Sequence, residues 1–234
     1  MHSLSARQLL SVWEQGMAQT PVDRALALLS ASGAGGTADL QILPVGHRDA
    51  LLLKLRQRTF GSDIECVTAC PLCSEQVELH VRVQDLLIEA PELPLGRAEL
   101  KMRERSLEFR LPDSLDLAAA AEHSTIEEAR QTLLGRCLTA PAELTDDEAR
   151  AVADEMARLD PQGDVQLELK CPSCRHAWKA GFDILPIFWG ELNAWAERLL
   201  REVHELAREY GWSEADILGM SAWRRQLYLN MVVA

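Results

Sequence analysis

The sequence predicts an α+β fold, in which helical N- and C-terminal regions surround a discontinuous β region with a helical insertion. Apolar residues recur at helical spacing near both ends of the chain, and they alternate at strand spacing around two Cys-x-x-Cys motifs. Helix-capping residues are frequent between the two motifs. We therefore expect five consecutive segments, namely N-terminal helices in 1–61, the first motif with β-hairpins in 62–112, the helical insertion in 113–163, the second motif in 164–184 and C-terminal helices in 185–234.

Three helices are expected before the first Cys-x-x-Cys motif. Ser5 opens a capping box for the first helix, which should run to about Gly16. Pro21 suits the first turn of the second helix, and the glycine-rich segment SASGAGGTAD after it is expected to be a flexible link. The third helix covers PVGHRDALLLKLRQRTF, because Gly61 suits a C-terminal cap.

Strand spacing appears in three stretches around the two motifs. Apolar residues alternate with polar ones from Val77 to Val83, from Leu100 to Leu111, and from Val165 to Leu169. The middle stretch is divided by a polar turn at Arg103 to Ser106 and followed by Pro112, so it predicts a hairpin. The β region is therefore interrupted and then resumed.

The helical insertion is predicted from its capping residues. Ser114, Ser124 and Thr145 are suitable N-caps, and Pro161 ends the last of these segments.

The C-terminal region carries an apolar seam, in which Leu192, Leu199 and Leu206 recur every seven residues until Gly211 breaks the helix. One or two short final helices take their apolar faces from Ile217, Leu218, Trp223, Leu227, Tyr228 and Met231. We expect most of the seam to be buried against the N-terminal helices, with a partner-binding surface in what remains. The residues considered for that surface are Trp189, Leu192, Leu199, Leu206, Trp212 and Trp223.

Composition narrows the classes of function. With 36 acidic and 24 basic residues the chain has a formal charge of -12, which repels phosphate backbones and anionic lipids, so neither nucleic acid nor membrane is an expected partner. The start of the chain is amphipathic without a cleavable signal region, and we expect a cytoplasmic protein in a reducing compartment. Because the common catalytic and phosphate-binding motifs are missing, we expect no enzymatic activity and no small-molecule substrate.

Four cysteines, Cys70, Cys73, Cys171 and Cys174, predict one structural zinc ion per chain. A Cys-x-x-Cys turn brings two sulfurs to the roughly 3.7 Å separation that zinc–sulfur bonds of about 2.3 Å imply. Both turns, CPLC and CPSC, lie between strand-like segments, as in the two knuckles of a zinc ribbon. Closing the loop of 97 intervening residues costs only about 4 kcal/mol, less than the roughly 10 to 16 kcal/mol of zinc binding. Four thiolates leave no open coordination position for catalysis.

Other interpretations of the cysteines stay open. The alternatives are four buried thiols without metal and a redox pair, although a reactive Cys-x-x-Cys normally lies at a helix N-terminus. Cys66, His80 or His176 lies close enough in sequence to replace a ligand. Cys137 follows a helical pattern and is expected in the core.

Several segments together resemble one family, and they are VWEQG with DRALALLSA, LPVGHRDALLLKLRQRTFG, CPLC, FRLPDSLDLAA, CPSC and HELAREYGWSEADIL. The chain resembles the baseplate hub assembly chaperones of contractile phage tails, of the T-even phage type, and of related bacterial contractile injection systems. One departure is that Ser74 and Arg175 follow the knuckles where glycine is common.

The resemblance implies a non-enzymatic assembly chaperone or structural adaptor for the baseplate hub. Hub or spike proteins would be its partners, held in part by the segment from about Trp189 to Val233. It would act in the cytoplasm of the producing bacterium and then either leave or stay in the assembled particle. A zinc-ribbon adaptor of an unrelated intracellular complex and a metal-dependent enzyme are the alternatives.

Overall fold

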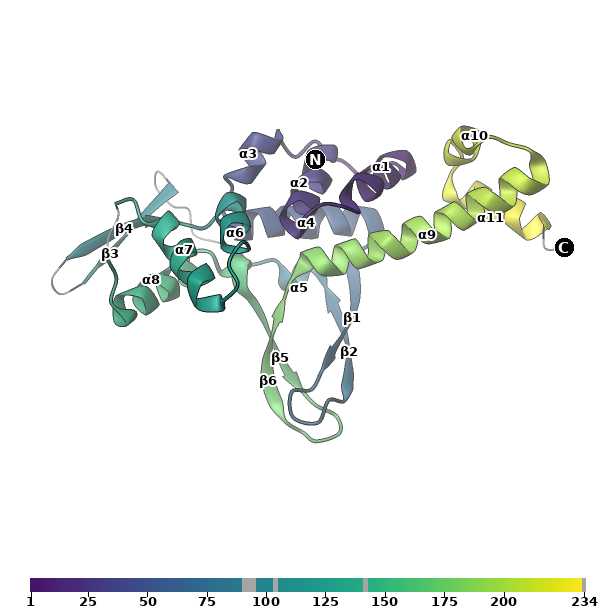
Figure 1. The fold of residues 1–234 in the computed structure, drawn as a ribbon. Helices are drawn as coiled ribbons and strands as arrows, with labels where there is room; N and C mark the ends of the chain where they lie inside the picture. Colours follow the sequence, from purple (N-terminus) through teal and green to yellow (C-terminus); the bar gives the residue numbers. More distant parts are fainter. Residues whose placement is uncertain (90–95, 103–104, 141–142, 233–234) are drawn as a thin grey trace.

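The computed structural model describes residues 1–89, 96–102, 105–140 and 143–232. A central helical body carries two long β-hairpins that project side by side from it (Figure 1). The helical insertion lies on one side of the body, and a long C-terminal helix leads away on the other (Figure 1). Mixed helices and small antiparallel sheets confirm the predicted α+β class.

The body begins with four helices, α1 (Ala6–Gly16), α2 (Pro21–Ala31), α3 (Thr37–Gln41) and α4 (Val45–Phe60). The capping box of Ser5 with Gln8 is present, and Gly61 ends α4 with φ 98°. The segment SASGAGGTAD is not simply a flexible link, because its end forms the start of α3. Leu40 anchors that short helix, since its side chain is buried in the main core.

The first half of α9 (Ile184–Tyr210) completes the body. Phe188 and Leu192 are fully buried in the same apolar cluster as residues of α1, α2 and α4. The Arg56 guanidinium donates to the Glu191 carboxylate at 2.8 Å (Nε to Oε2), and Trp13 Nε1 donates to an oxygen of α9. This helix is therefore fixed to both α1 and α4.

The two projecting hairpins are antiparallel pairs, formed by β1 (Asp63–Ala69) with β2 (Gln76–Arg82) and by β5 (Val165–Lys170) with β6 (Ala177–Phe182). The predicted strand around residues 77–83 is confirmed except at its last residue. Val83 begins the short helix α5 (Val83–Leu86), because its side chain enters the main core rather than a strand face.

The insertion comprises α6 (Ser114–Ala120), α7 (Ile126–Cys137), α8 (Asp146–Leu159) and a 3₁₀ turn at Pro161–Asp164. Thr145 caps α8 as predicted, but Asp113 and Thr125, rather than Ser114 and Ser124, cap α6 and α7. Each true cap lies one residue from the predicted one. At these positions the side-chain oxygens of Asp113 and Thr125 accept hydrogen bonds from backbone N–H groups in the first turn of each helix.

The predicted hairpin also forms, from β3 (Arg97–Lys101) and β4 (Ser106–Arg110). Part of its predicted turn, residues 103–104, lies outside the described residues. Leu107 and Phe109 of β4 pack against the insertion in a second apolar cluster, with Leu134, Val152 and Met156. This hairpin is thus joined to the insertion by a core of its own.

The C-terminal arm consists of the second half of α9, α10 (Glu214–Leu218) and α11 (Ala222–Val232). Gly211 ends α9 in the left-handed conformation at φ 67°. Ser213 and Asp216 form a capping box for α10. Among the described residues no helix combines the length and the apolar character needed to cross a membrane.

Candidate metal centre

The tips of the two projecting hairpins bring together four cysteines that are distant in sequence. Cys70 and Cys73 lie in the β1–β2 turn, and Cys171 and Cys174 lie in the β5–β6 turn. Their four sulfur atoms all lie within 4.8 Å of one another. The predicted meeting of the two Cys-x-x-Cys motifs is therefore observed.

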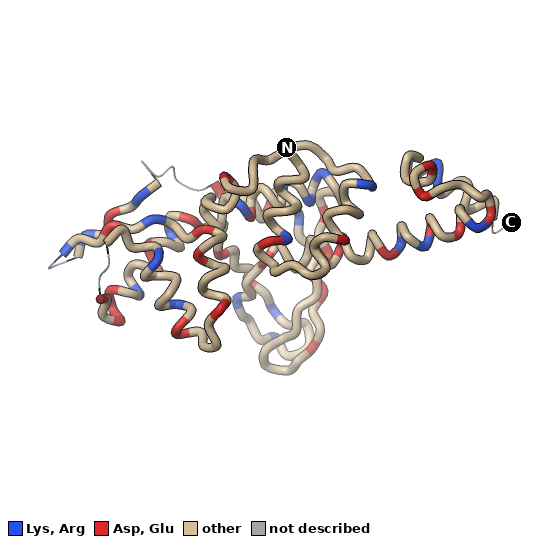
Figure 2. Tube along the Cα trace, turned by 45° about the horizontal axis from the view of Figure 1, so that its top comes forward, with Lys and Arg blue, Asp and Glu red and all other residues tan. Residues whose placement is uncertain are grey.

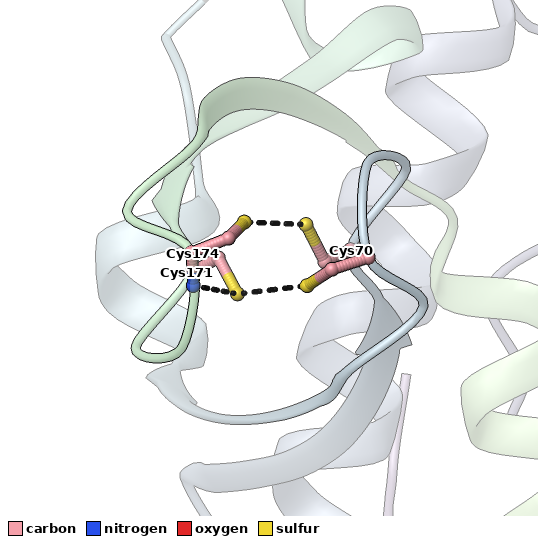
Figure 3. A group of neighbouring side chains, drawn as sticks. Cys70, Cys171 and Cys174 are labelled. Atoms are coloured by element: carbon pink, nitrogen blue, oxygen red, sulfur yellow. Dashed lines mark hydrogen bonds between the residues drawn. The ribbon is translucent and has the colours of Figure 1, made fainter.

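The sulfurs of opposite turns face each other across the centre (Figure 3). The Sγ atoms of Cys70 and Cys174 are 3.7 Å apart, and those of Cys73 and Cys171 are 3.6 Å apart. These separations are too long for a disulfide bond of about 2.05 Å. They match the roughly 3.7 Å edge of a tetrahedron of sulfurs around a zinc ion.

Both turns use the same local hydrogen bonds. In the first turn, the Cys70 N–H donates to the Glu75 carbonyl at 2.8 Å and the Ser74 N–H to the Cys70 carbonyl at 2.9 Å. In the second turn, the Cys171 N–H donates to the His176 carbonyl at 2.9 Å, and the Arg175 N–H donates to the Cys171 carbonyl at 3.0 Å. The two halves of the centre are therefore built alike.

A left-handed residue closes each turn. Ser74 has φ 60° and Arg175 has φ 64°, and they are the only non-glycine residues with positive φ in the described ranges. This conformation brings Cβ close to the backbone, which explains why glycine is favoured at such positions. The departure from glycine thus leaves the turn geometry in place with some strain.

Backbone N–H groups polarise one of the sulfurs. The N–H groups of Cys174 and Ser173 point toward the Cys171 sulfur and lower its pKa to about 7. The Glu75 N–H acts in the same direction on Cys73, yet the neighbouring thiols, Cys174 first, raise the pKa of Cys73 to about 12. Four thiolates at these distances repel one another, so a cation between them is required for all four to be deprotonated.

The donor set fits a soft divalent metal. Thiolates favour zinc or a similar soft ion, and four of them at tetrahedral spacing fill its coordination sphere. The Sγ atoms come from exposed Cys73 and Cys174 and from buried Cys70 and Cys171, so each turn supplies one outer and one inner ligand.

The other sequence-predicted candidates lie elsewhere. Cys66 lies on β1 opposite Leu79, and burial raises the pKa of its thiol. The His176 ring stacks on Trp178, with ring centroids 6.2 Å apart, and His80 Nδ1 lies 3.7 Å from a carboxylate oxygen of Glu65. None of these side chains joins the four-cysteine group found in the described part of the chain.

Residues considered for a partner surface are mostly covered within the chain itself. Leu192 is buried against the N-terminal helices, as expected. Leu199 packs against Leu10, but Leu206 is covered by α10 and α11 rather than by the N-terminal helices. Trp189 and Trp212 are partly buried, the former beneath the Arg24 guanidinium at 4.5 Å from the ring centroid.

Trp223 is the exception, because 74% of its surface is exposed. The end of the predicted partner segment, Val233, lies outside the described residues.

Sequence reasoning missed two polar connections that hold the insertion. Asp116 is fully buried and accepts hydrogen bonds from the guanidinium groups of Arg110 and Arg136, the latter at 2.8 Å (Oδ1 to Nε). The Asp160 carboxylate accepts from the N–H of Gly46 at 2.8 Å and so fastens the end of α8 to the start of α4. The partners of the second connection are 114 residues apart in the sequence, so no local pattern indicates it.

Comparison with known families identifies the class of protein. Residues 19–189 match the family model described as T4 bacteriophage base plate protein, a stretch that includes both Cys-x-x-Cys turns, the insertion and most of the helical body. Because this match covers well over half of the chain, the protein belongs to the T4 bacteriophage base plate protein family. No curated protein and no solved structure matches the chain.

Proposed function

We propose that Cys70, Cys73, Cys171 and Cys174 hold one structural zinc ion. The support is geometric, since four sulfurs at tetrahedral spacing come from two turns of the same construction. The role would be structural rather than catalytic, because four protein thiolates leave no position for water or substrate.

The ion would replace a hydrophobic core at the hairpin tips. An isolated two-stranded hairpin is only marginally stable in water. Val67 is 59% exposed, and Leu79 and Leu167 are half-buried, so the middle of each hairpin buries little apolar surface. The metal therefore supplies the link that keeps the two hairpins side by side.

We further propose that the protein is a non-enzymatic assembly chaperone or structural adaptor for the baseplate hub of a contractile phage tail or a related injection system. The observation that carries this proposal is the family match across both knuckles and the helical body. It also favours this role over that of a zinc-ribbon adaptor in an unrelated complex. Hub or spike proteins are the proposed partners, and the cytoplasm of the producing bacterium is the proposed place of assembly.

The charges and the shape suit a protein that binds other proteins. Acidic and basic residues are interspersed along α9 (Figure 2), and ion pairs such as Arg201 with Glu197 lie on its exposed surface. The projecting hairpins and the C-terminal arm extend from the body in different directions (Figure 1). Such projections offer separate contact points to neighbouring subunits.

Deletion of the chain from the producing bacterium tests the proposed role. We expect tails whose baseplates lack the hub, with sheath and tube proteins still made at normal levels. Particles purified from the intact strain, searched for this chain, separate the adaptor, which stays, from the chaperone, which leaves. Normal numbers of particles with complete hubs in the deletion strain would contradict the proposal.

A further inference from the structure

Helix α11 presents an apolar stripe to solvent. Trp223, Leu227 and Met231 follow one another at intervals of four residues, and 74%, 37% and 63% of their surfaces are exposed. Side chains at this spacing lie on one face of a helix. Among its exposed neighbours on α11, Gln226 and Asn230 are uncharged and Arg224 is basic.

The opposite face of α11 fixes the direction of the stripe. Leu229 is buried with Val203, Leu206 and Ile217 in the apolar cluster of the arm. Arg225 is only 5% exposed and donates to the Glu202 carboxylate on α9 at 3.2 Å and to the Met220 carbonyl at 2.9 Å. The arm therefore holds α11 so that the stripe points away from the protein.

The area of the stripe argues against pairing with a second copy. A fully exposed aromatic side chain offers at most about 250 Å². Even if Leu227 and Met231 were as large as an aromatic residue, the exposed parts of the three side chains would total at most about 440 Å². That area is about half of the roughly 800 Å² that each partner contributes to a standard interface. Two such stripes packed together would be too small, whereas a groove that encloses the stripe adds the surface of its own walls.

The charges around the stripe indicate which residues a partner would place at the edge of such a groove. The chain as a whole carries a formal charge of -12, but it has no acidic residue after Asp216 and two arginines on α11. Arg225 is paired internally, whereas Arg224 is exposed beside the stripe, with its guanidinium carbon 5.7 Å from the centre of the Tyr228 ring. A carboxylate at the edge of the groove would complement this arginine.

We propose that the stripe of Trp223, Leu227 and Met231 docks into an apolar groove, edged by carboxylates, on another protein of the baseplate. Trp223 is the main anchor, because it is the most exposed of the three side chains and tryptophan is enriched among the residues that contribute most to binding energy. This inference rests on the proposed role in baseplate assembly and names the surface through which the contact is made.

A photo-cross-linker at position 223 tests the inference in the full-length chain. Benzoylphenylalanine replaces Trp223 in one variant and Ile126 in the control, whose apolar side chain is 90% exposed on α7. Each variant is co-expressed with the hub and spike proteins of the same tail and irradiated. We expect position 223, but not position 126, to form an adduct with one of these proteins, at a groove edged by aspartate or glutamate.

Affinity for the partner so identified gives a second readout. We expect Trp223→Ala to raise its Kd at least about 30-fold and Ile126→Ala to leave it within about 2-fold. Arg224→Glu should raise the Kd about 10-fold, mainly at low salt.

An adduct between two copies of this chain, or equal Kd values for Trp223→Ala and the unaltered chain, would overturn the inference. If the chain still forms a complex with hub proteins but position 223 gives no adduct, the inference fails and the proposed function stands. Failure to form any complex with baseplate proteins would contradict the proposed function itself.

Discussion

The protein stabilises its β-hairpins in two different ways. Hairpin β3–β4 lies against the insertion, where Phe109 is fully buried among side chains of α7 and α8. Hairpins β1–β2 and β5–β6 contribute Ile64 and Val165 to the main core near the body, and they carry the four cysteines at their far ends (Figure 1). One hairpin thus depends on apolar packing, whereas the other two meet at a four-cysteine cluster, which we propose holds a metal.

This difference has a physical reason. Apolar packing needs a second layer of secondary structure to cover the sheet face, which α7 and α8 provide for β3–β4. The paired hairpins project beyond the helices, so their tips have no such layer (Figure 1). A four-thiolate metal site needs only two turns whose sulfur atoms lie a few ångströms apart. Such a site can therefore join two hairpins at their tips without a second layer of secondary structure.

The largest effect should come from Cys171→Ser, which removes a buried ligand. Because the free energy of metal binding is also free energy of folding, we expect a loss of several kcal/mol in the paired hairpins. Limited proteolysis should cut these hairpins while the insertion stays resistant. Cys66→Ser is the control, since that thiol lies outside the four-cysteine group. Equal melting temperature and protease resistance in both variants would contradict a structural metal.

Phe109→Ala should have the next largest effect, on the other hairpin. The truncation leaves a cavity in the second apolar cluster, and we expect a loss of about 3 to 5 kcal/mol in urea unfolding with zinc content unchanged. Glu108→Ala, an exposed position on the same strand, should cost less than about 0.5 kcal/mol. If Phe109→Ala also released the metal, the two regions would not be independent.

Acid should weaken the insertion through Asp116. Burial alone would raise the pKa of this carboxyl, but the guanidinium of Arg110 and the N–H of Asp113 outweigh it, with help from Arg136, and lower the pKa to about 2. Since the folded-state pKa lies below the unfolded value near 4, the ionised carboxylate stabilises the fold above that pH. This contribution disappears as the pH falls toward 2.

The measurement is the difference in unfolding free energy between the unaltered chain and Asp116→Asn at several pH values. We expect about 1 to 2 kcal/mol at pH 5 and a smaller difference near pH 2. Loss of zinc in acid affects both chains alike and cancels. Asp147→Asn, at a side chain that is 92% exposed, is the control. A difference that does not change with pH would exclude this role for the carboxylate.

The smallest effect should be a gain in stability at the two Cys-x-x-Cys turns. Ser74→Gly and Arg175→Gly relieve left-handed residues with φ 60° and 64°, and each should stabilise the paired hairpins by about 0.5 to 1 kcal/mol. Slower transfer of zinc to a chromogenic chelator would report the gain. Ser173→Gly, where φ is not positive, should speed the transfer slightly. Faster transfer in all three variants would mean that the turns are not strained.

Local patterns in the sequence predicted most helices and strands. The caps at Ser5 and Thr145 and the break at Gly211 are decided within one helical turn, and the structure confirms them. The cysteine cluster was predictable for the same reason, because each half of it is a local motif. The residue at which β2 gives way to α5, Val83, could not be predicted in this way, because its burial in the main core decides where the strand ends.

Long-range contacts were beyond these patterns. The packing of β4 against α7 and α8 gives the insertion its own core, and no spacing in the sequence indicates that contact. The hydrogen bond from Gly46 to Asp160 was equally unpredictable from local spacing. It requires glycine at position 46, because a Cβ there would lie 1.9 Å from an Asp160 carboxylate oxygen. The α11 stripe did leave a signal, the four-residue spacing from Trp223 to Met231, but its exposure depends on how the arm folds back.

The most direct test of the account is X-ray absorption at the zinc edge, combined with metal analysis, on the full-length chain purified without chelator. We expect one zinc ion per chain with four sulfur neighbours at about 2.3 Å, and an ion lost from the Cys171→Ser variant. A folded protein free of metal, or an ion with oxygen or nitrogen in its coordination sphere, would contradict the four-cysteine centre.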